Sequence, residues 1–486
     1  MTSGRLWAAA AAARSIALLV VMAALLWSRV GAMEQSLWND EAYTATFFVR
    51  GGPATILSRY IPNNHVLFSL LTCWTTRTFG ESEIAYRVWG VGPACGAVAL
   101  GVVWLWRRQG ALAAITFAAL LTVNLLALEL GREARGYGLA LFAQASVVVS
   151  AKRALERPSI GYFALYSFAG ALGTLTLPIF GLSLAFTSVV LLVATRARAL
   201  VLSLGVCVVV IVMVYAPLLR QMLASSTQEF GSPLPWYGPV VAPLEQLLLR
   251  TMSVIFFPMV PSAVILSLLV ALVAFGCRRL QRTDDAQDVW LLLVPVVGSY
   301  AVLALLGLFV EDRFQSFLMI NLTMLIAMGV AECSYVLHGW MLAEWAWIGM
   351  LALVGLSGWQ RFADIAHRTH ELPRENFKAA AAVVRASKIG RVVTNSARPV
   401  GWFFYLPGVV RVLPANRLVE EFCDSTEGIV FIDHPFRASP VNTRCLEEAG
   451  AFRHRVLQRE RDDYIDVWVR FPVKHVDRAN SSTADE

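Results

Sequence analysis

Two acidic residues, Asp40 and Glu41, directly follow the first long apolar segment of the chain, within residues 38–43 (WNDEAY). An ionisable group at membrane depth is costly unless it is paired or functional. Adjacent side chains point in different directions in a helix or a strand, which argues against a paired-carboxylate site. One acid is then a candidate general base, while the other binds a metal or orients the loop. A helix-capping acid beside a solvated neighbour explains the pair equally well.

Further polar groups stand at the beginning of later apolar segments. His65 precedes an amphipathic run, although a single histidine is more often an interface residue than a ligand. Glu83 and Arg87 are four residues apart with the acid first, the favourable order for an ion pair on a helix. For these two residues, a helix-anchoring pair is a simpler interpretation than catalysis.

Arginines mark two other turns. Arg132 and Arg135 lie between two apolar segments and share one helical face, just before Tyr137. Arginine is suited to bidentate binding of phosphate, and a charged turn is the simpler alternative. Arg313 and Phe314 repeat this situation after Glu311-Asp312. These turns are distant in sequence, and we predict that they lie on one face of the membrane.

Composition indicates a membrane protein. The chain of 486 residues is 57% hydrophobic and 15% charged, with a net charge of +7. Its mean hydropathy is +0.59. Soluble domains are less apolar and carry about 25% charged residues. Basic residues fall in short clusters between apolar runs, which is typical of cytoplasmic loops and not of a nucleic-acid interface.

The apolar runs predict an α-helical polytopic protein, because about 20 apolar residues span a bilayer. We predict about eleven transmembrane helices, at residues 12–33, 84–106, 111–130, 137–154, 160–177, 179–195, 199–218, 251–276, 289–309, 316–336 and 342–359. The basic clusters place the N-terminus in the cytoplasm and the C-terminus outside. Residues 1–359 form the membrane domain, and 34–83 form its first outer loop with an interfacial helix at 65–79.

Residues 360–473 predict a small extracytoplasmic α/β domain, followed by a disordered tail at 474–486. We expect helices at 373–387 and 443–452, and strands at 391–394, 428–433 and 464–471. Cys423 and Cys445 lie in this domain. A disulfide between them and two separate buried thiols are equally good interpretations.

The ordered set of motifs resembles the family 39-type glycosyltransferases of the GT-C class, which include protein O-mannosyltransferase-like and lipid A aminoarabinose transferase-like enzymes. The resemblance covers about residues 10–360. It rests on Asp40-Glu41, on 64–65 (NH) and 79–83 (FGESE) with Arg87, and on 132–140 (REARGYGLA). Arg313-Phe314 resembles an Arg-Tyr pair late in the helix bundle of that family.

The resemblance implies a donor sugar on a polyprenyl phosphate, transferred with inversion to a lipid, glycan or protein acceptor on the outer face. Asp40 would be the general base. Arg132, Arg135 and Arg313 would stabilise the departing phosphate, because negative charge develops there. Glu41 is a candidate ligand of a divalent cation. Tyr43, His65, Glu83, Arg87 and Tyr137 are further candidate substrate contacts, and the arginine-rich composition suits a bacterial inner (plasma) membrane protein.

Two other functions explain part of the pattern. A lipid-linked sugar flippase or transporter explains the helices, but it predicts polar groups near the middle of the bilayer and broken helices in repeated halves. A non-catalytic scaffold predicts that Asp40 tolerates replacement by Asn. An enzyme accounts for the ordered acids and arginines together, and we favour it.

Overall fold

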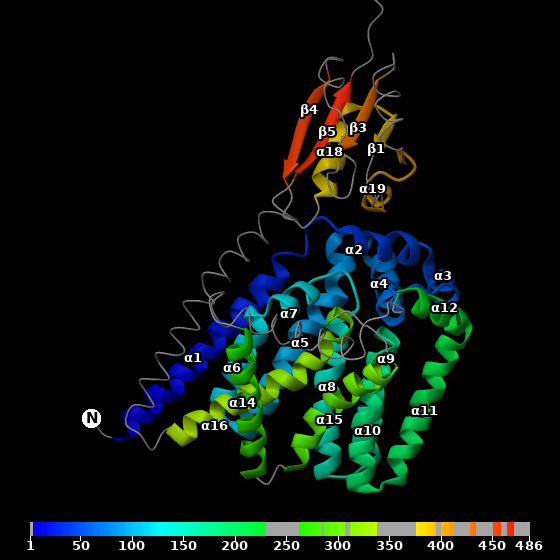
Figure 1. Ribbon diagram of the computed structural model, residues 1–486. Helices are drawn as coiled ribbons and strands as arrows, with labels where there is room; N and C mark the ends of the chain where they lie inside the picture. Colours follow the sequence, from blue (N-terminus) through cyan, green and yellow to red (C-terminus); the bar gives the residue numbers. More distant parts are fainter. Residues whose placement is uncertain are drawn as a thin grey trace, which may run out of the picture. The chain divides into compact units, whose positions relative to one another are not determined.

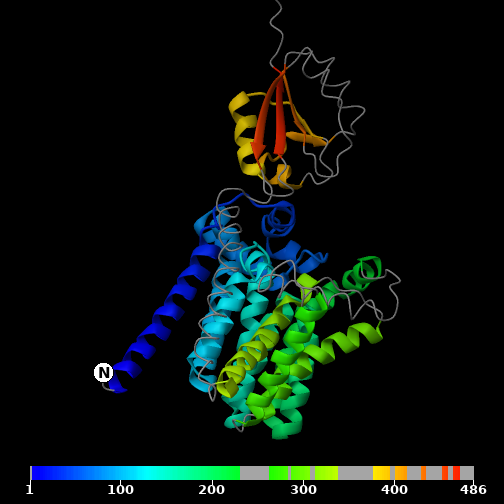
Figure 2. The same ribbon diagram turned by 60° about the vertical axis from the view of Figure 1, so that its left-hand side comes forward.

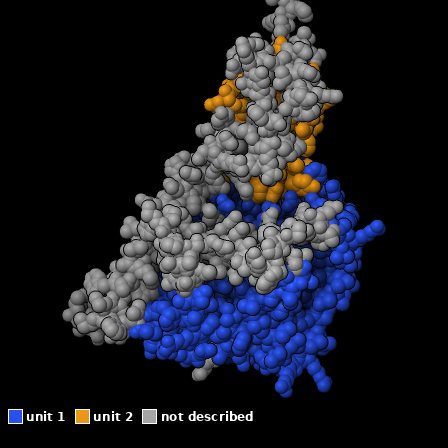
Figure 3. All heavy atoms as spheres, viewed as in Figure 1, with its two compact units in different colours: residues 1–34, 47–367 blue, residues 35–46, 368–486 orange. Residues whose placement is uncertain are grey.

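The apolar runs form long helices in a computed structural model (Figure 1). The structure describes residues 3–229, 262–282, 286–306, 312–337, 376–394, 400–412, 428–433, 451–457 and 464–470. The chain divides into two compact units, residues 1–34 with 47–367 and residues 35–46 with 368–486 (Figure 3). The segment that carries Asp40 and Glu41 therefore belongs to the same unit as the C-terminal region.

The first unit is helical. In its described parts the elements are α1 (Ser3–Val30), α3 (Gly52–Ser58), α4 (Val66–Phe79), α5 (Glu83–Gln109), α6 (Ala111–Val123), α7 (Leu125–Leu130), α8 (Tyr137–Glu156), α9 (Ile160–Thr176), α10 (Phe180–Thr195), α11 (Arg198–Tyr215), η2 (Ala216–Leu218), α12 (Leu219–Glu229), α14 (Ser262–Arg282), α15 (Ala286–Leu305), η3 (Asp312–Leu318) and α16 (Met319–Leu337). The short helix η1 (Ala45–Val49) begins in the second unit and ends in the first.

Six helical stretches among the described residues are long and apolar enough to cross a membrane. They are Ala12–Val30, Glu83–Gln109, Tyr137–Glu156, Arg198–Ala224, Ala286–Leu305 and Arg313–Val336. Shorter apolar helices cover the spans predicted at 111–130, 160–177 and 179–195. The span predicted at 342–359 and the first half of that at 251–276 lie outside the described residues. The chain is thus a helical membrane protein, and the count of about eleven spans stays a prediction.

One predicted span is divided. The run 111–130 forms α6 and α7, which are separated at Asn124. The Asn124 side chain accepts a hydrogen bond from the backbone N–H of Ala127, at 2.8 Å. Asparagine is a strong N-cap residue, so a new helix begins there. Nearby, the buried Arg29 of α1 donates from Nη2 to the carbonyl oxygen of Leu121, at 3.0 Å.

Basic helix ends meet at one end of this unit. Lys152 Nζ of α8 lies 2.8 Å from Asp288 Oδ1 of α15. Arg282 Nη1 of α14 lies 2.7 Å from Glu332 Oε1 of α16. Since Lys152, Asp288 and Glu332 are almost fully buried, these pairs fix the ends of four helices against one another.

The second unit contains a mixed β-sheet (Figure 2). Its five described strands stand in the order β2-β1-β3-β5-β4. The described elements of this unit are α2 (Asn39–Thr44), α18 (Phe377–Ser387), β1 (Val392–Thr394), α19 (Val400–Tyr405), β2 (Val410–Val412), β3 (Ile429–Asp433), β4 (Phe452–Leu457) and β5 (Tyr464–Arg470). β1 is parallel to β2 and β3, whereas β5 is antiparallel to β3 and β4. The register pairs Val392 with Val430, and Val430 with Val469.

The core of this sheet follows from amphipathic patterns. α18 buries Phe377, Ala380, Ala381 and Val384, the spacing of one helical face. They pack against Trp402 and against apolar residues of β1, β3 and β5. Phe431 and Trp468 are buried on the other sheet face.

The three predicted strands are confirmed as β1, β3 and β5, with shifts of one residue at their ends. The first helix begins at Phe377, later than the predicted Pro373, because Asn376 caps it through the N–H of Ala379. The helix predicted at 443–452 is wrong at its end, since Phe452 begins the strand β4 and pairs with Val469. Residues 443–450, together with Cys423, lie outside the described residues, and Cys445 is among them. α19, β2 and β4 were not predicted.

Candidate functional site

The short helix α2 carries both acids of the first motif. Asp40 is half-buried, and Tyr43 is half-buried on the same helix. Glu41 is buried, and its Oε2 accepts a hydrogen bond from the backbone N–H of Trp38 at 3.0 Å. A glutamate at the third helical position commonly reaches back in this way to cap the helix. The capping interpretation thus applies to Glu41, while Asp40 is the more accessible carboxylate.

Glu41 is the candidate ligand of a divalent cation. Its Oε2 is engaged by the Trp38 amide, and the part of the chain that the structure describes contains no group of three His, Cys, Asp or Glu residues able to hold a metal. A divalent cation at Glu41 therefore stays a prediction.

The loop between α7 and α8 holds two buried arginines of the first unit. Arg132 is 7% exposed and Arg135 is fully buried. Arg135 Nη2 donates to Asn63 Oδ1 at 2.8 Å, and its guanidinium lies 4.9 Å from the centre of the Tyr137 ring. The helix α8 that follows this loop packs closely against α5, because glycine stands at the contact. A Cβ on Gly138 would lie only 2.0 Å from the carbonyl oxygen of Gly90 in α5.

His65 lies beside this loop. It is 1% exposed, its ring centre is 5.0 Å from that of Tyr137, and a Cβ on Gly136 would lie 2.9 Å from its Nδ1. Neither ring nitrogen has a hydrogen-bond partner among the described residues. Burial, and then the positive charges of Arg135 and Arg313, lower the pKa of His65 well below its usual value. The imidazole is therefore neutral at neutral pH, in a region of positive potential.

Arg313 completes this group from η3. Its guanidinium lies 5.2 Å from the centre of the Phe314 ring, and that ring lies 6.3 Å from the Tyr137 ring. Four candidate residues from three distant stretches of sequence thus form one cluster, which we call the arginine cluster: His65, Arg135, Tyr137 and Arg313. The turns that carry Arg135 and Arg313 thus lie close together, and their common face of the membrane stays a prediction.

Glu83 and Arg87 lie at the beginning of α5. Glu83 is half-buried in the first turn, and Arg87 is 5% exposed. Arg87 Nη1 donates to the carbonyl oxygens of Ala32 and Met33, both at 3.2 Å. Arg87 therefore anchors the chain as it leaves α1, and its proposed contact with substrate stays a prediction.

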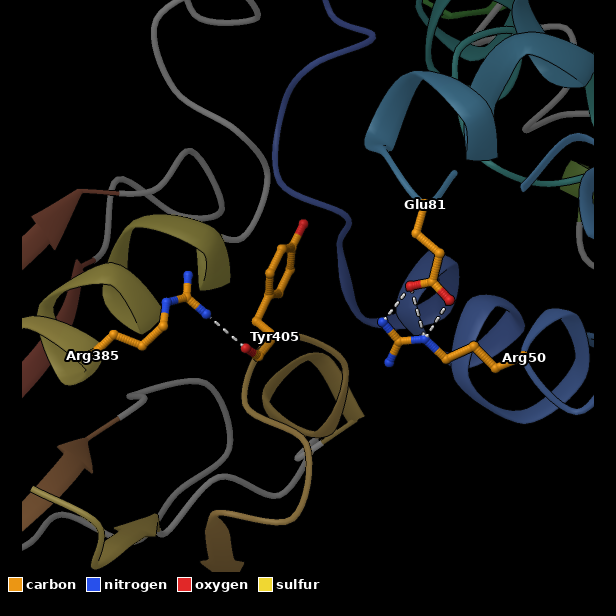
Figure 4. Close-up of polar contacts among 4 residues, drawn as sticks. All are labelled: Arg50, Glu81, Arg385 and Tyr405. Atoms are coloured by element: carbon orange, nitrogen blue, oxygen red, sulfur yellow. Dashed lines mark hydrogen bonds and ion pairs between the residues drawn. The ribbon is translucent and has the colours of Figure 1, made fainter. Parts of the chain in front are cut away.

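Two residues of the segment 34–83 were not among the predicted site residues. Arg50 binds Glu81 with Nε–Oε1 at 3.1 Å and Nη2–Oε2 at 2.7 Å, so η1 is tied to the start of α5 (Figure 4). Asn63 orients Arg135. Asn63 stands beside the quoted motif, but its partner is 72 residues away, and nothing local indicates the pairing.

Comparison with known proteins supports the fold. No protein-family model and no curated protein matches the sequence. Among solved structures, apo ArnT from Cupriavidus metallidurans matches over 94% of this chain and 98% of its own, with TM-score 0.54 and 13% identity. The same protein bound to undecaprenyl phosphate matches over 93% and 97%, with TM-score 0.57 and 12% identity.

A third match, the Archaeoglobus fulgidus oligosaccharyltransferase with Zn and sulfate, covers 85% of this chain and 67% of its own. The TM-score of this match is 0.49, and the sequence identity is 12%. The ArnT matches span nearly the whole of both chains, so the described chain has the fold of ArnT. This confirms the GT-C fold that the sequence resemblance predicted.

Proposed function

We propose that this protein is a membrane glycosyltransferase that moves a sugar from a polyprenyl-phosphate donor to an acceptor on the outer face of the membrane. The observation that carries the proposal is the arginine cluster. Arg135 is fully buried, and its charge and that of Arg313 add to the effect of burial in lowering the pKa of His65. A buried positive potential favours an anion, and arginine is the residue best suited to phosphate. ArnT, whose fold this chain shares, has been crystallised with undecaprenyl phosphate.

The leaving group explains why arginines are needed. As the bond between the anomeric carbon and the phosphate oxygen breaks, the lipid phosphate keeps the electron pair and gains negative charge. Arg135 and Arg313, with Arg132 from the same loop as Arg135, would stabilise that charge. The neutral His65 and the Tyr137 hydroxyl would contact the phosphate or the sugar.

Asp40 would act on the acceptor. An acceptor hydroxyl attacks the anomeric carbon from the face opposite the phosphate, and its proton passes to the Asp40 carboxylate. This displacement inverts the configuration at that carbon. Asp40 is the better of the two acids for this role because Glu41 already caps α2. Tyr43 and Glu83 are further proposed substrate contacts.

The proposal is tested by release of a labelled sugar from a panel of polyprenyl-phosphate donors. Membranes containing the wild type are incubated with cell-envelope extract as the acceptor source. We expect Asp40→Asn to lower kcat about a hundredfold or more, because a general base contributes about that much. Glu34→Gln, an exposed acid of the same outer region, is the matched control and should retain activity.

A second variant tests the proposed contact between Arg135 and the donor phosphate. Arg135→Gln should raise the KM for the donor at least about tenfold, since charge-assisted hydrogen bonds are worth roughly 1.5–3 kcal/mol. The exposed Arg157→Gln serves as its control. Full activity of Asp40→Asn would remove the general base from the proposal. Donor translocation without sugar release by the wild type would instead favour the flippase.

A further inference from the structure

Helix α2, which carries Asp40, is part of the C-terminal unit. It packs against α19, and residues 35–46 cluster with residues 368–486. Leu37, Ala42 and Ala45, which precede and line this helix, are fully buried. An isolated helix of six residues does not persist in water, because the first turn costs more than it gains. The orientation of α2 must therefore come from the residues that pack around it.

Two hydrogen bonds join this segment to the C-terminal part of the chain. The backbone N–H of Leu37 donates to the Tyr405 hydroxyl at 2.8 Å, across 368 residues of sequence. The backbone N–H of Lys378 donates to Ser36 Oγ at 3.2 Å. Leu37 and Ser36 immediately precede the Trp38 cap, so both bonds fix the chain where it enters α2.

Tyr405 is itself held in place. It is the last residue of α19, and Arg385 Nη1 of α18 donates to its carbonyl oxygen at 2.9 Å (Figure 4). Its ring lies 4.8 Å from that of Phe404 in an edge-on arrangement. The hydroxyl that accepts from Leu37 thus belongs to a side chain positioned by α18 and α19.

We propose that the C-terminal α/β domain is the positioning element for the Asp40 helix, with Tyr405 as its positioning residue. This inference rests on the proposed function. A general base has to be held within a few tenths of an ångström of its productive geometry, by residues that are themselves packed. The domain would supply that support to a helix too short to hold itself.

The test uses Tyr405→Phe in the full-length protein, which removes only the hydroxyl and leaves the ring and the Arg385 bond. We expect kcat to fall about tenfold to a hundredfold, the range that small misplacements of a catalytic group produce, with the donor KM within about twofold. Hydrogen exchange of the peptide containing Leu37 should become faster. Tyr335→Phe, an exposed tyrosine of α16, is the control and should change neither quantity.

The double variant separates positioning from general damage. If Tyr405 acts through Asp40, Tyr405→Phe should not lower the activity of Asp40→Asn further, because the base is already absent. An equal additional loss in that background, or unchanged exchange at Leu37, would overturn the inference. If Tyr405→Phe does not fold, Ser36→Ala removes the second bond and is measured in the same way.

Failure of the proposed function gives a different result. Full activity of Asp40→Asn would exclude Asp40 as the base. The bond between Leu37 and Tyr405, which we call the anchor, would then have no role in catalysis. The exchange rate at Leu37 in Tyr405→Phe would still report whether the anchor exists. The two failures are therefore distinguishable.

Discussion

At the scale of single residues, His65 links the arginine cluster to a measurable pH dependence. Its pKa in the folded protein is well below 6.5, first because of burial and then because of Arg135 and Arg313. The unfolded chain therefore takes up a proton below about pH 6.5 that the folded protein does not bind. The free energy of unfolding should fall by up to about 1.4 kcal/mol per pH unit in that range, until the folded pKa is reached.

Thermal unfolding in detergent, from about pH 8 down to about pH 5, measures this effect. His65→Gln should reduce the slope below about pH 6.5 by one proton. His454→Gln, an exposed histidine of β4, is the matched control. An identical slope in His65→Gln would show that His65 is not the group responsible.

At the scale of elements, a buried polar network joins α8, α10, α15 and α16. Gln144 Nε2 donates to Asn321 Oδ1 at 2.8 Å, and Ser183 Oγ donates to Gln144 Oε1 at 3.0 Å. Asn321 Nδ2 donates to the carbonyl oxygen of Leu292 at 3.1 Å. Pro295 lies inside α15 and has no N–H, so the carbonyl oxygen of Leu291 lacks its usual helical donor. Asn321 Nδ2 lies 3.5 Å from that oxygen and can donate to it instead.

Asn321→Leu should lower the free energy of unfolding by about 1–2 kcal/mol, because it leaves buried polar groups without their partner. Unfolding in a denaturing detergent measures the loss. Gln144→Leu combined with Asn321→Leu should cost clearly less than the two single changes added together, since the partners interact. Strict additivity would mean that the network contributes no coupling.

At the scale of the whole molecule, the basic ends of α5, α8 and α14 decide the expected orientation. Arg108 of α5 pairs with Glu156 of α8, and Arg279 Nε of α14 donates to Gln109 Oε1 at the end of α5, so the three ends meet. Cytoplasmic ends of membrane helices carry an excess of Lys and Arg, so we expect this end to face the cytoplasm. The opposite helix ends, with the arginine cluster, would then face outward.

Cysteine labelling in intact cells tests this orientation. In a cysteine-free background, Arg157→Cys at the basic end should resist a membrane-impermeant maleimide. Thr78→Cys at the end of α4 and Arg411→Cys in β2, both exposed, should react. The reverse pattern would place the arginine cluster inside the cell and exclude transfer on the outer face.

Sequence alone determined the features that depend on local composition. Apolar runs of sufficient length located the long described helices, because helix formation in a membrane depends on hydropathy along one continuous segment. The short helices α2, α3 and α12 were not predicted. Capping residues such as Asn124 and Asn376 set where individual helices begin within these runs. The motif residues His65, Arg135, Tyr137 and Arg313 were each identified, and a shared face was predicted from the alternation of spans.

Tertiary structure decided which of these residues meet and what holds them. The Asn63–Arg135 bond and the Leu37–Tyr405 bond join residues 72 and 368 positions apart. No local sequence pattern predicts such a pair, because the residues around each partner would look the same if the two partners never met. The assignment of α2 to the C-terminal unit, and of Glu41 to capping, follows from burial and from hydrogen bonds that only the folded chain contains. Hydropathy is a property of consecutive residues, so the sequence alone reveals it. The positions of side chains depend on contacts between residues that are distant in the sequence, which only the folded chain contains.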